Sequence, residues 1–527
     1  MSQNASAFRA TLVVSACRLT NAGLALALGM LSATYFGTSV AKDCYLVAQT
    51  IPNLISTFLM GGLYGNLLVS LAAVGRRDGI SGQKRFARRT LWQVTLWLTP
   101  CILVVLAGAR HFTALIAPGF TPDRAALSAS LLRISIFGLA GGVYFTVTRC
   151  LFEVRGRFGV SNLTHVLINL VSVIVLVLLV GRLGIFALPL GSLLGAVIAV
   201  GLLSLAAARM LRDPAGFSPQ AEAGGLHAEH RRDFWVAFLP MSLAANTGTI
   251  NLLVDNAFAS FLPSGSITTL GFAFVIISNA ELLTSLSLAE VVFPRLAAAA
   301  QAGRGELAGI LRSSQRHMLI LTAPLCAGAL TFGTPLARLL FERGAFPPES
   351  TAMVARLIAC YAPEILFMGH QVILARVLFA RRCLAALAWS SAGAIAANAV
   401  LNSLLVKPFG LAGIALATTA VSLVSLLVLI PLVRREVGAI RGPGDTLFAA
   451  RVLVSATIMG AVLLVWAGFF GNLADLGKEG PRIIQVMSGL ALGVGTYLAL
   501  LHLLRVDEAR DILARVLSSA TGLVRRP

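Results

Sequence analysis

One permanently charged side chain, Arg18, interrupts an apolar segment that covers about residues 11–36. Burying a guanidinium at the centre of a membrane costs at least about 2.5 to 3.5 kcal/mol, so such a residue normally faces a wet cavity or a fixed partner. A guanidinium is also a natural bidentate partner of phosphate. Contact with a substrate in such a cavity is therefore the first of three candidate roles for Arg18. One alternative is a salt bridge to Asp43, to Asp255 or to an acid of the eighth span. The other is that the Arg18 side chain extends along the helix so that its guanidinium reaches the inner membrane interface.

Other polar residues could contact a substrate or control access to it. Lys42 and Asp43 lie at the outer end of the first predicted hairpin, where gating, substrate contact and solvation are alternatives. Asn53 follows Pro52, so its amide could bind a hydroxyl group or satisfy backbone groups that the proline leaves without a partner. Glu281 lies in the middle of an apolar segment and is therefore a cavity candidate.

Three further titratable residues are candidates for gating or coupling. Glu290 lies nine residues after Glu281, two and a half helical turns, which places it on roughly the opposite face and near the cytoplasmic end. Glu364 and His370 share one segment and could carry a proton, with internal hydrogen bonding as the alternative. No bound cofactor is expected, and H⁺ is one possible coupling ion.

An aspartate, two amides and a hydroxyl in three later segments form a possible cation site. Asn398 and Asn402 are four residues apart, so they share a face of their helix. Oxygen ligands suit a hard cation such as Na⁺. The alternative is an amide network in which each hydrogen bond contributes about 0.6 kcal/mol. The predicted sodium ligands are Asp255, Asn398, Asn402 and Thr418.

The composition places these residues in a membrane. Of the 527 residues, 57% are hydrophobic and only 12% are charged, whereas soluble domains are about 45 to 50% apolar and about 25% charged. The seven cysteines lack CxxC spacing, which favours buried apolar positions over a disulfide framework or a zinc site. An all-α, polytopic membrane protein is expected.

Fourteen segments are long and apolar enough to cross a bilayer, which needs about 20 apolar residues per helix. The predicted spans cover about residues 11–36, 44–75, 90–109, 126–150, 159–181, 183–208, 234–262, 267–294, 314–335, 352–380, 385–406, 409–433, 447–470 and 482–504.

The distribution of charge predicts the orientation. Residues 76–89 are expected to form a cytoplasmic loop because they carry six Lys or Arg and one Asp. With both termini inside, thirty of the 42 Lys and Arg lie on the cytoplasmic side and nine on the outer side. This asymmetry explains the net charge of +20 without nucleic acid. A bacterial inner (cytoplasmic) membrane location with both termini cytoplasmic is predicted.

Enzymatic activity is not expected. The predicted outer loops are short, and the sequence has no Walker, GxSxG or HExxH motif. His227 and His230 lie in a polar stretch, where a solvated loop is favoured over a metal site.

A weak internal repeat predicts two similar halves. The segment that begins at Gly37 resembles the one that begins at Gly265, 228 positions later, and Arg149 matches Arg376 at an offset of 227. Duplicated halves that face each other are typical of alternating-access transporters. The predicted domains are an N-lobe (1–211, helices 1–6), a cytoplasmic linker (212–233), a C-lobe (234–437, helices 7–12), helices 13–14 (438–505) and an amphipathic cytoplasmic tail (506–527).

Several motifs resemble one known family, the MurJ/MviN lipid flippases of the MOP superfamily, which also contains MATE exporters. The similar segments are FGTSVAKDCYLVAQTIPNL (36–54), APGF (117–120), NLLVDNAFASFLPSGSITTLGFA (251–273), VVFPRLAAAAQAG (291–303) and LFERGAFPPES (340–350). Fourteen spans also agree with this family rather than with twelve-span MATE proteins.

The resemblance implies export of a polyprenyl-pyrophosphate-linked saccharide, lipid II in the founding members, from the inner to the outer leaflet. The headgroup would cross a cavity, and the lipid tail would stay in a groove beside helices 13 and 14. Membrane lipids and cell-envelope synthesis enzymes are the other implied partners. The resemblance also places sodium between the helices that carry Asp255 and Asn398.

The sequence departs from the family pattern at several cavity positions. The family's basic pair falls on Ser56 and Thr57, which become candidate substrate-binding residues, and an arginine usual in helix 8 falls on Val275. These departures favour a related envelope glycan precursor over lipid II itself. The alternatives are a MATE-like small-molecule exporter and a transport-inactive scaffold for cell-envelope synthesis.

Overall fold

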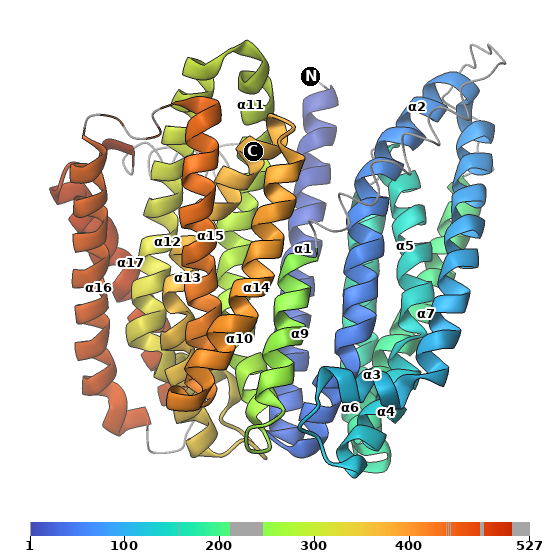
Figure 1. Cartoon of the computed structure of the whole chain (residues 1–527), viewed down its shortest axis with the longest axis horizontal. Coiled ribbons are helices and arrows are strands. Elements are labelled where there is room, and N and C mark those ends of the chain that lie inside the picture. The colour runs from blue at the N-terminus through green and yellow to red at the C-terminus, as the bar shows by residue number, and fades with distance from the viewer. Residues whose placement is uncertain are drawn as a thin grey trace. The chain divides into compact units, whose positions relative to one another are not determined.

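A computed structural model describes residues 2–155, 158–210, 246–438, 440, 442, 444–474 and 479–508. The chain divides into two compact units, residues 1–268 with 343–346, and residues 269–342 with 347–527. Each is all-helical in its described part (Figure 1). The predicted linker 212–233 and residues 509–527 of the predicted tail lie outside the described residues.

The first unit contains a long helical hairpin and the shorter helices that pack on it. Its elements are α1 (Ser2–Phe36), α2 (Val40–Ala107), α3 (Ala109–Ile116), α4 (Pro122–Ser135), α5 (Gly138–Glu153), α6 (Phe158–Leu183), η1 (Gly184–Phe186), α7 (Ala187–Met210) and α9 (Thr247–Ala259). α2 packs against α4 and α5, α6 packs against α1 and α7, and α5 also contacts α7.

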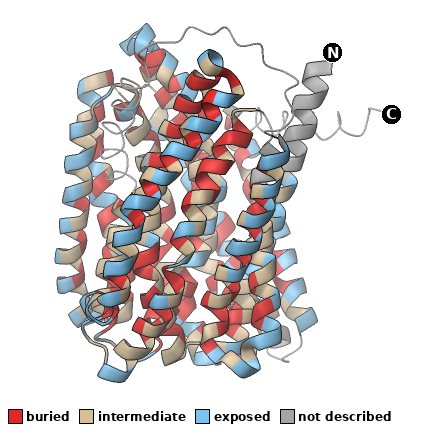
Figure 2. Cartoon of the chain, turned by 90° about the vertical axis from the view of Figure 1, so that its right-hand side faces the viewer, coloured by how far each residue is buried: buried red, intermediate tan, exposed pale blue. Residues whose placement is uncertain are grey.

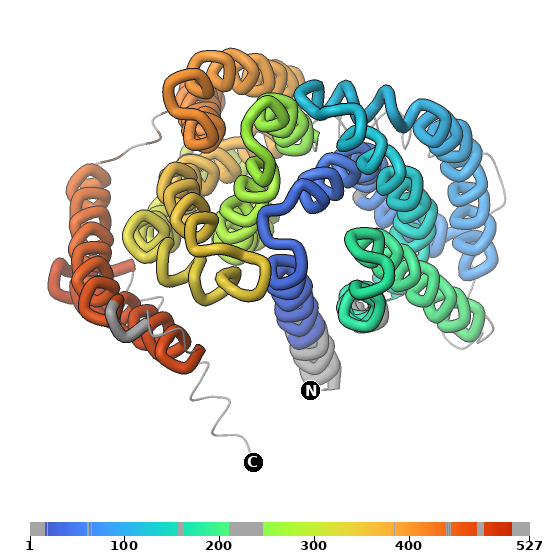
Figure 3. The backbone as a smooth tube through the Cα atoms, turned by 90° about the horizontal axis from the view of Figure 1, so that it is seen from below, coloured from blue at the N-terminus to red at the C-terminus, as the bar shows by residue number. Residues whose placement is uncertain are grey.

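The second unit is built around α12 and α13. Its elements are α10 (Ser266–Glu281, whose first residues belong to the first unit), the π-helical turn η2 (Leu282–Leu286), α11 (Ser287–Ala302), α12 (Arg304–Phe341), α13 (Pro348–Ala380), α14 (Leu384–Phe409), α15 (Leu411–Val437), α16 (Asp445–Ala474) and α17 (Glu479–Leu503). α13 lies between α12 and α15, whereas α16 and α17 pack together beside α12 (Figure 3).

Thirteen of the fourteen predicted spans coincide with helices, and the described part of the seventh is helical as α9. By length and composition, eleven stretches of the described chain could cross a membrane, and two of them, 66–107 and 163–209, each overlap two predicted spans. Residues 234–245 of the seventh predicted span lie outside the described ranges. Helices satisfy their own backbone groups in lipid, which is why so apolar a chain forms them.

Segment 76–89 was expected to be a cytoplasmic loop, but it is helical. α2 continues through it and is broken only at Gly79, whose φ of 63° and ψ of −156° leave the helical region. A positive φ is strained for residues with a side chain, so this glycine permits the chain to reverse between two spans. The Lys and Arg residues on both sides are good helix formers, which explains why helix extends to the turn.

Helix faces in both units alternate between buried and exposed residues (Figure 2). The exposed faces carry large apolar side chains such as Trp97, Val465 and Phe469, each more than 70% exposed. Apolar surface of this kind is expected where the surrounding solvent is lipid.

Candidate functional site

The predicted site residues fall in both units, and the geometry of each is given within its own unit.

Asp43 stands in the first turn of α2 and caps the start of α10, whose first residues belong to the first unit. Its carboxylate accepts hydrogen bonds from the backbone N–H of Gly265 at 2.5 Å, the backbone N–H of Thr268 at 2.8 Å and the Thr268 hydroxyl at 2.7 Å. Its side chain is buried. Burial raises the pKa of Asp43, although these donors and the nearby Arg124 lower it. Asp43 therefore fixes the start of α10.

Lys42, beside it, is buried rather than solvated. Its Nζ donates to Ser32 Oγ at 2.6 Å and lies 4.8 Å from the centre of the Tyr45 ring. Burial lowers the pKa of Lys42 to about 7. Because of this lowered pKa, the Lys42 ammonium group can lose its proton near neutral pH.

Asn53, Ser56 and Thr57 share one face of α2 because they are three and four residues apart. Asn53 is exposed and the other two are half-buried. Side chains with this accessibility can meet a polar ligand. The side chain of Arg18, on α1, lies outside the described residues, so its contact stays a prediction.

The acids of the second unit differ sharply in burial. Glu281 is buried at the end of α10, directly before the π-helical turn, and its Oε1 accepts no hydrogen bond within the described residues, whereas Glu290 is exposed. π-helical turns occur frequently at functional sites. A buried carboxyl group with an unsatisfied oxygen is a suitable place for a transported proton.

Glu364 and His370 have different partners on α13. Glu364 accepts a 3.4 Å hydrogen bond from Ser422, whereas the His370 ring bonds to the Gln315 side chain. Six residues apart on one helix, they point in different directions. Gln315 also donates to the His370 carbonyl at 3.3 Å.

The predicted sodium ligands occupy both units. Asn398 and Asn402, both fully buried, are joined by a 2.8 Å hydrogen bond from Asn402 Nδ2 to Asn398 Oδ1. Thr418 donates to the Ile414 carbonyl at 3.1 Å. Asp255 is buried in α9 of the first unit. Carboxylate, amide and hydroxyl oxygens are ligands that suit a hard cation, and the sodium site stays a prediction.

A buried ionic cluster in the first unit was missed by the sequence analysis. Glu153 accepts from Arg149 Nε at 2.7 Å and from the Tyr64 hydroxyl at 2.7 Å, and the guanidinium lies 4.7 Å from the centre of the Tyr64 ring. The i,i+4 spacing of Arg149 and Glu153 was a visible signal. Arg149 was considered only as part of the topology and of the internal repeat.

Comparison with known proteins decides the family. The sequence matches the family described as Lipid II flippase MurJ over residues 32–479. The chain belongs to the MurJ lipid II flippase family. The family is one of transporters, so the predicted transporter class, rather than an enzyme, is confirmed.

Named relatives in other bacteria are distant in sequence. A probable lipid II flippase MurJ of Synechocystis sp. is 26% identical over 504 residues, which cover 91% of this chain and 92% of that protein. The lipid II flippase MurJ of Burkholderia cenocepacia is 25% identical over 511 residues, or 94% and 96% of the two chains. A Rhizobium meliloti relative reaches 29% identity, but that match spans only 62% of each protein, less than two thirds.

Solved structures show the same fold. A lipid II flippase MurJ in an inward closed conformation matches with a TM-score of 0.76 and 19% identity, covering 95% of this chain and 100% of that one. A multidrug resistance MATE family transporter of the MOP superfamily matches with a TM-score of 0.64 and 13% identity, over 79% and 94% of the two chains. The predicted MurJ-like, multi-pass helical fold is thereby confirmed.

Proposed function

We propose that this MurJ-family chain moves a polyprenyl-pyrophosphate-linked saccharide, lipid II or a related envelope precursor, from the inner to the outer leaflet by alternating access. The family match over residues 32–479 carries the proposal. A pyrophosphate sugar cannot cross about 30 Å of hydrocarbon unaided, so its transfer needs a protein path. The family is found in the bacterial inner membrane, and we propose that both termini are cytoplasmic.

Each candidate residue has a role in this proposal. Arg18 draws the pyrophosphate into the path, and Asn53, Ser56 and Thr57 offer neutral hydrogen-bonding groups to the saccharide. Asp43 and Lys42 act at the outer end. The coupling candidates are Glu281, Glu290, Glu364 and His370 for protons, and Asp255, Asn398, Asn402 and Thr418 for Na⁺.

In this proposal, relative motion of the two halves opens the path to one side of the membrane or the other. The N-lobe (1–211) and the C-lobe (234–437), joined by the linker 212–233, would rock to open the path to either side. Helices 13 and 14 would hold the lipid tail, and the tail segment 506–527 would lie on the inner leaflet.

The test is rescue of a bacterial strain depleted of its own lipid II flippase. Arg18→Ala should abolish rescue while the protein still reaches the membrane, because alanine offers no hydrogen bond to phosphate. Arg18→Lys should retain part of the activity, since charge remains without the bidentate geometry. Arg133→Ala, at an exposed position, is the matched control and should rescue fully.

Normal rescue by Arg18→Ala would contradict the role given to this residue. If even the wild-type chain fails to rescue, native mass spectrometry of the purified protein distinguishes the remaining cases. A copurified polyprenyl pyrophosphate saccharide other than lipid II supports the broader substrate class. Transport of cationic dyes with no bound lipid-linked saccharide would instead support a MATE-like exporter.

A further inference from the structure

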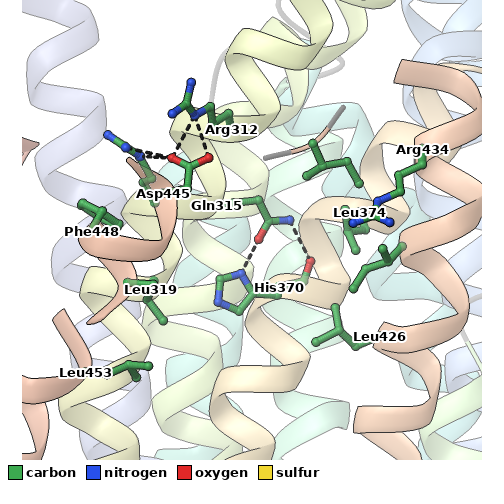
Figure 4. A pocket seen from close by; sticks show the side chains of 14 residues that line it. Arg312, Gln315, Leu319, His370, Leu374, Leu426, Arg434, Asp445, Phe448 and Leu453 are labelled. Carbon is green, nitrogen blue, oxygen red and sulfur yellow. Dashed lines mark hydrogen bonds and ion pairs between the residues drawn. The ribbon is translucent and has the colours of Figure 1, made fainter. Parts of the chain in front are cut away.

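A cavity of about 320 Å³ lies inside the second unit, between α12, α13, α15 and α16 (Figure 4). This volume is at the lower end of the range for small-molecule sites. Its walls divide into a charged part and an apolar part. It is lined by Arg312, Gln315, Arg316, Leu319, His370, Leu374, Leu426, Ile430, Arg434, Ile440, Asp445, Phe448, Ala449 and Leu453.

Two arginines of the charged part are fixed by one carboxylate. Asp445, in the first turn of α16, accepts from Arg312 Nε at 2.8 and 2.9 Å and from Arg316 Nε at 2.8 Å. Arg316 also pairs with Glu508 and lies 4.5 Å from the centre of the Phe448 ring. The guanidinium groups are therefore held in place before any ligand arrives, which lowers the entropy lost on binding.

A third arginine leaves the cavity with an excess of positive charge. Arg434, near the end of α15, lines the cavity, is exposed and forms no ion pair within the described residues. Within the described residues, three arginines thus face two carboxylates, Asp445 and Glu508. The balance of one positive charge matches a phosphodiester, which carries one negative charge, better than a pyrophosphate diester, which carries two.

The rest of the wall suits a hydrocarbon chain. Leu319 lies on the same side as Phe448 and Leu453 of α16, Leu374 and Leu426 lie on the side of Arg434, and Gln315 and His370 lie between the two sides (Figure 4). A ligand with an anionic head and an apolar chain would satisfy both parts. Basic pockets between membrane helices recognise anionic lipid head groups in this way.

We propose that this cavity binds an anionic phospholipid of the cytoplasmic leaflet, with its phosphate at Arg434 and the Arg312–Arg316 pair and an acyl chain along the leucine wall. The choice of leaflet rests on the proposed orientation, because the cavity lies at the ends of α12, α15 and α16 that carry clustered arginines. Such a lipid would tie α16 to the rest of the second unit.

The test measures binding of phosphatidylglycerol to the full-length protein in detergent by native mass spectrometry, with phosphatidylcholine as the comparison lipid. The wild-type protein should prefer phosphatidylglycerol. Arg434→Gln should weaken that binding roughly tenfold, because a charge-assisted hydrogen bond is lost. Arg435→Gln is the matched control, since this exposed neighbour removes the same charge without lining the cavity.

A second variant removes the apolar part without changing charge. Leu426→Trp should fill the cavity and reduce phosphatidylglycerol binding, with both arginines of α15 intact. Equal loss from Arg434→Gln and Arg435→Gln would overturn the proposal by showing a general effect of surface charge. Unchanged binding in both Arg434→Gln and Leu426→Trp would also overturn it.

One remaining outcome would assign the cavity to the substrate. If a polyprenyl pyrophosphate binds wild-type protein and loses affinity in Arg434→Gln, while phosphatidylglycerol does not, the phospholipid proposal is wrong. Rescue by the same variants separates this inference from the proposed function. If the wild-type chain fails to rescue and copurifies no lipid-linked saccharide, yet binds phosphatidylglycerol in an Arg434-dependent way, the flippase proposal is wrong and the lipid site stands.

Discussion

At the scale of single residues, two buried charges of the first unit, Lys42 and Glu153, are held by specific partners. Lys42 is enclosed by Ser32 and the Tyr45 ring, and Glu153 is enclosed by Arg149 and Tyr64. A buried charge is costly without a partner, so each of these contacts should be visible in stability.

Lys42 should make stability depend on pH. Its pKa is about 7 in the folded protein and about 10.4 when the chain is unfolded. Between these values the unfolded state binds more protons, so stability should increase as the pH rises from about 7 to about 10, by at most about 1.4 kcal/mol per pH unit. Thermal unfolding of wild-type protein and Lys42→Met across this range measures the effect. Parallel pH profiles of the two proteins would show that Lys42 does not titrate there.

The Glu153 cluster should be sensitive to loss of its charge. Glu153→Gln leaves the Arg149 guanidinium without its carboxylate, and breaking such a pair costs about 3 to 5 kcal/mol when it is fully buried. Arg149 is partly exposed, at 28%, so we expect the lower end of that range or less. Tyr64→Phe removes one hydrogen bond and should cost about 1 kcal/mol. Denaturation in detergent compares the two. A larger loss from Tyr64→Phe than from Glu153→Gln would show that the hydrogen bond of the Tyr64 hydroxyl matters more than the ion pair.

At the scale of elements, close helix packing in the second unit depends on small residues. A Cβ on Gly369 of α13 would lie 3.0 Å from Met318 Sδ, 3.0 Å from Ser285 Oγ and 3.0 Å from Thr322 Cγ2. α12, α13 and the π-helical turn therefore meet closely at this point. Small residues at such crossings are typical of membrane helices.

Gly369→Ala should separate these helices and destabilise the protein by about 1 to 3 kcal/mol, the usual cost of overpacking. Gly393→Ala on α14 is the matched control, because a Cβ there meets nothing within 4 Å. Alanine also has the higher helix propensity, so the control should be neutral or more stable by up to about 1 kcal/mol. Thermal unfolding of the two variants is the measurement, and equal midpoints would contradict the packing argument.

At the scale of the whole molecule, the proposed orientation makes a direct prediction. Lys407, near the end of α14, and Arg435, near the end of α15, are exposed and lie at opposite ends of the α14–α15 pair. In a variant that lacks the seven native cysteines, a cysteine at position 407 should react with a membrane-impermeant maleimide from outside intact cells. A cysteine at position 435 should react only after permeabilisation. The reverse labelling pattern would invert the topology and move the proposed lipid site to the outer leaflet.

The sequence by itself determined the class, the number of spans and the family. These follow from local properties. Runs of about 20 apolar residues must be helical in lipid, and motifs such as LFERGAFPPES can be recognised from consecutive residues alone. Within the described residues, the predicted spans therefore coincide with helices. A reversal of the chain within residues 76–89 was predicted correctly, but the turn is confined to Gly79. The residues around it are helical because they have good helix propensity.

Only the tertiary structure decided which polar groups meet. Asp43 could have faced water, but it binds Gly265 and Thr268, more than 200 residues away. Arg312, Arg316 and Arg434 were counted as signs of topology, yet they line one cavity with leucines from four helices. Pairings of this kind depend on which faces of distant helices pack together, and the rotation of each helix is set by the packing of the whole unit rather than by its own residues.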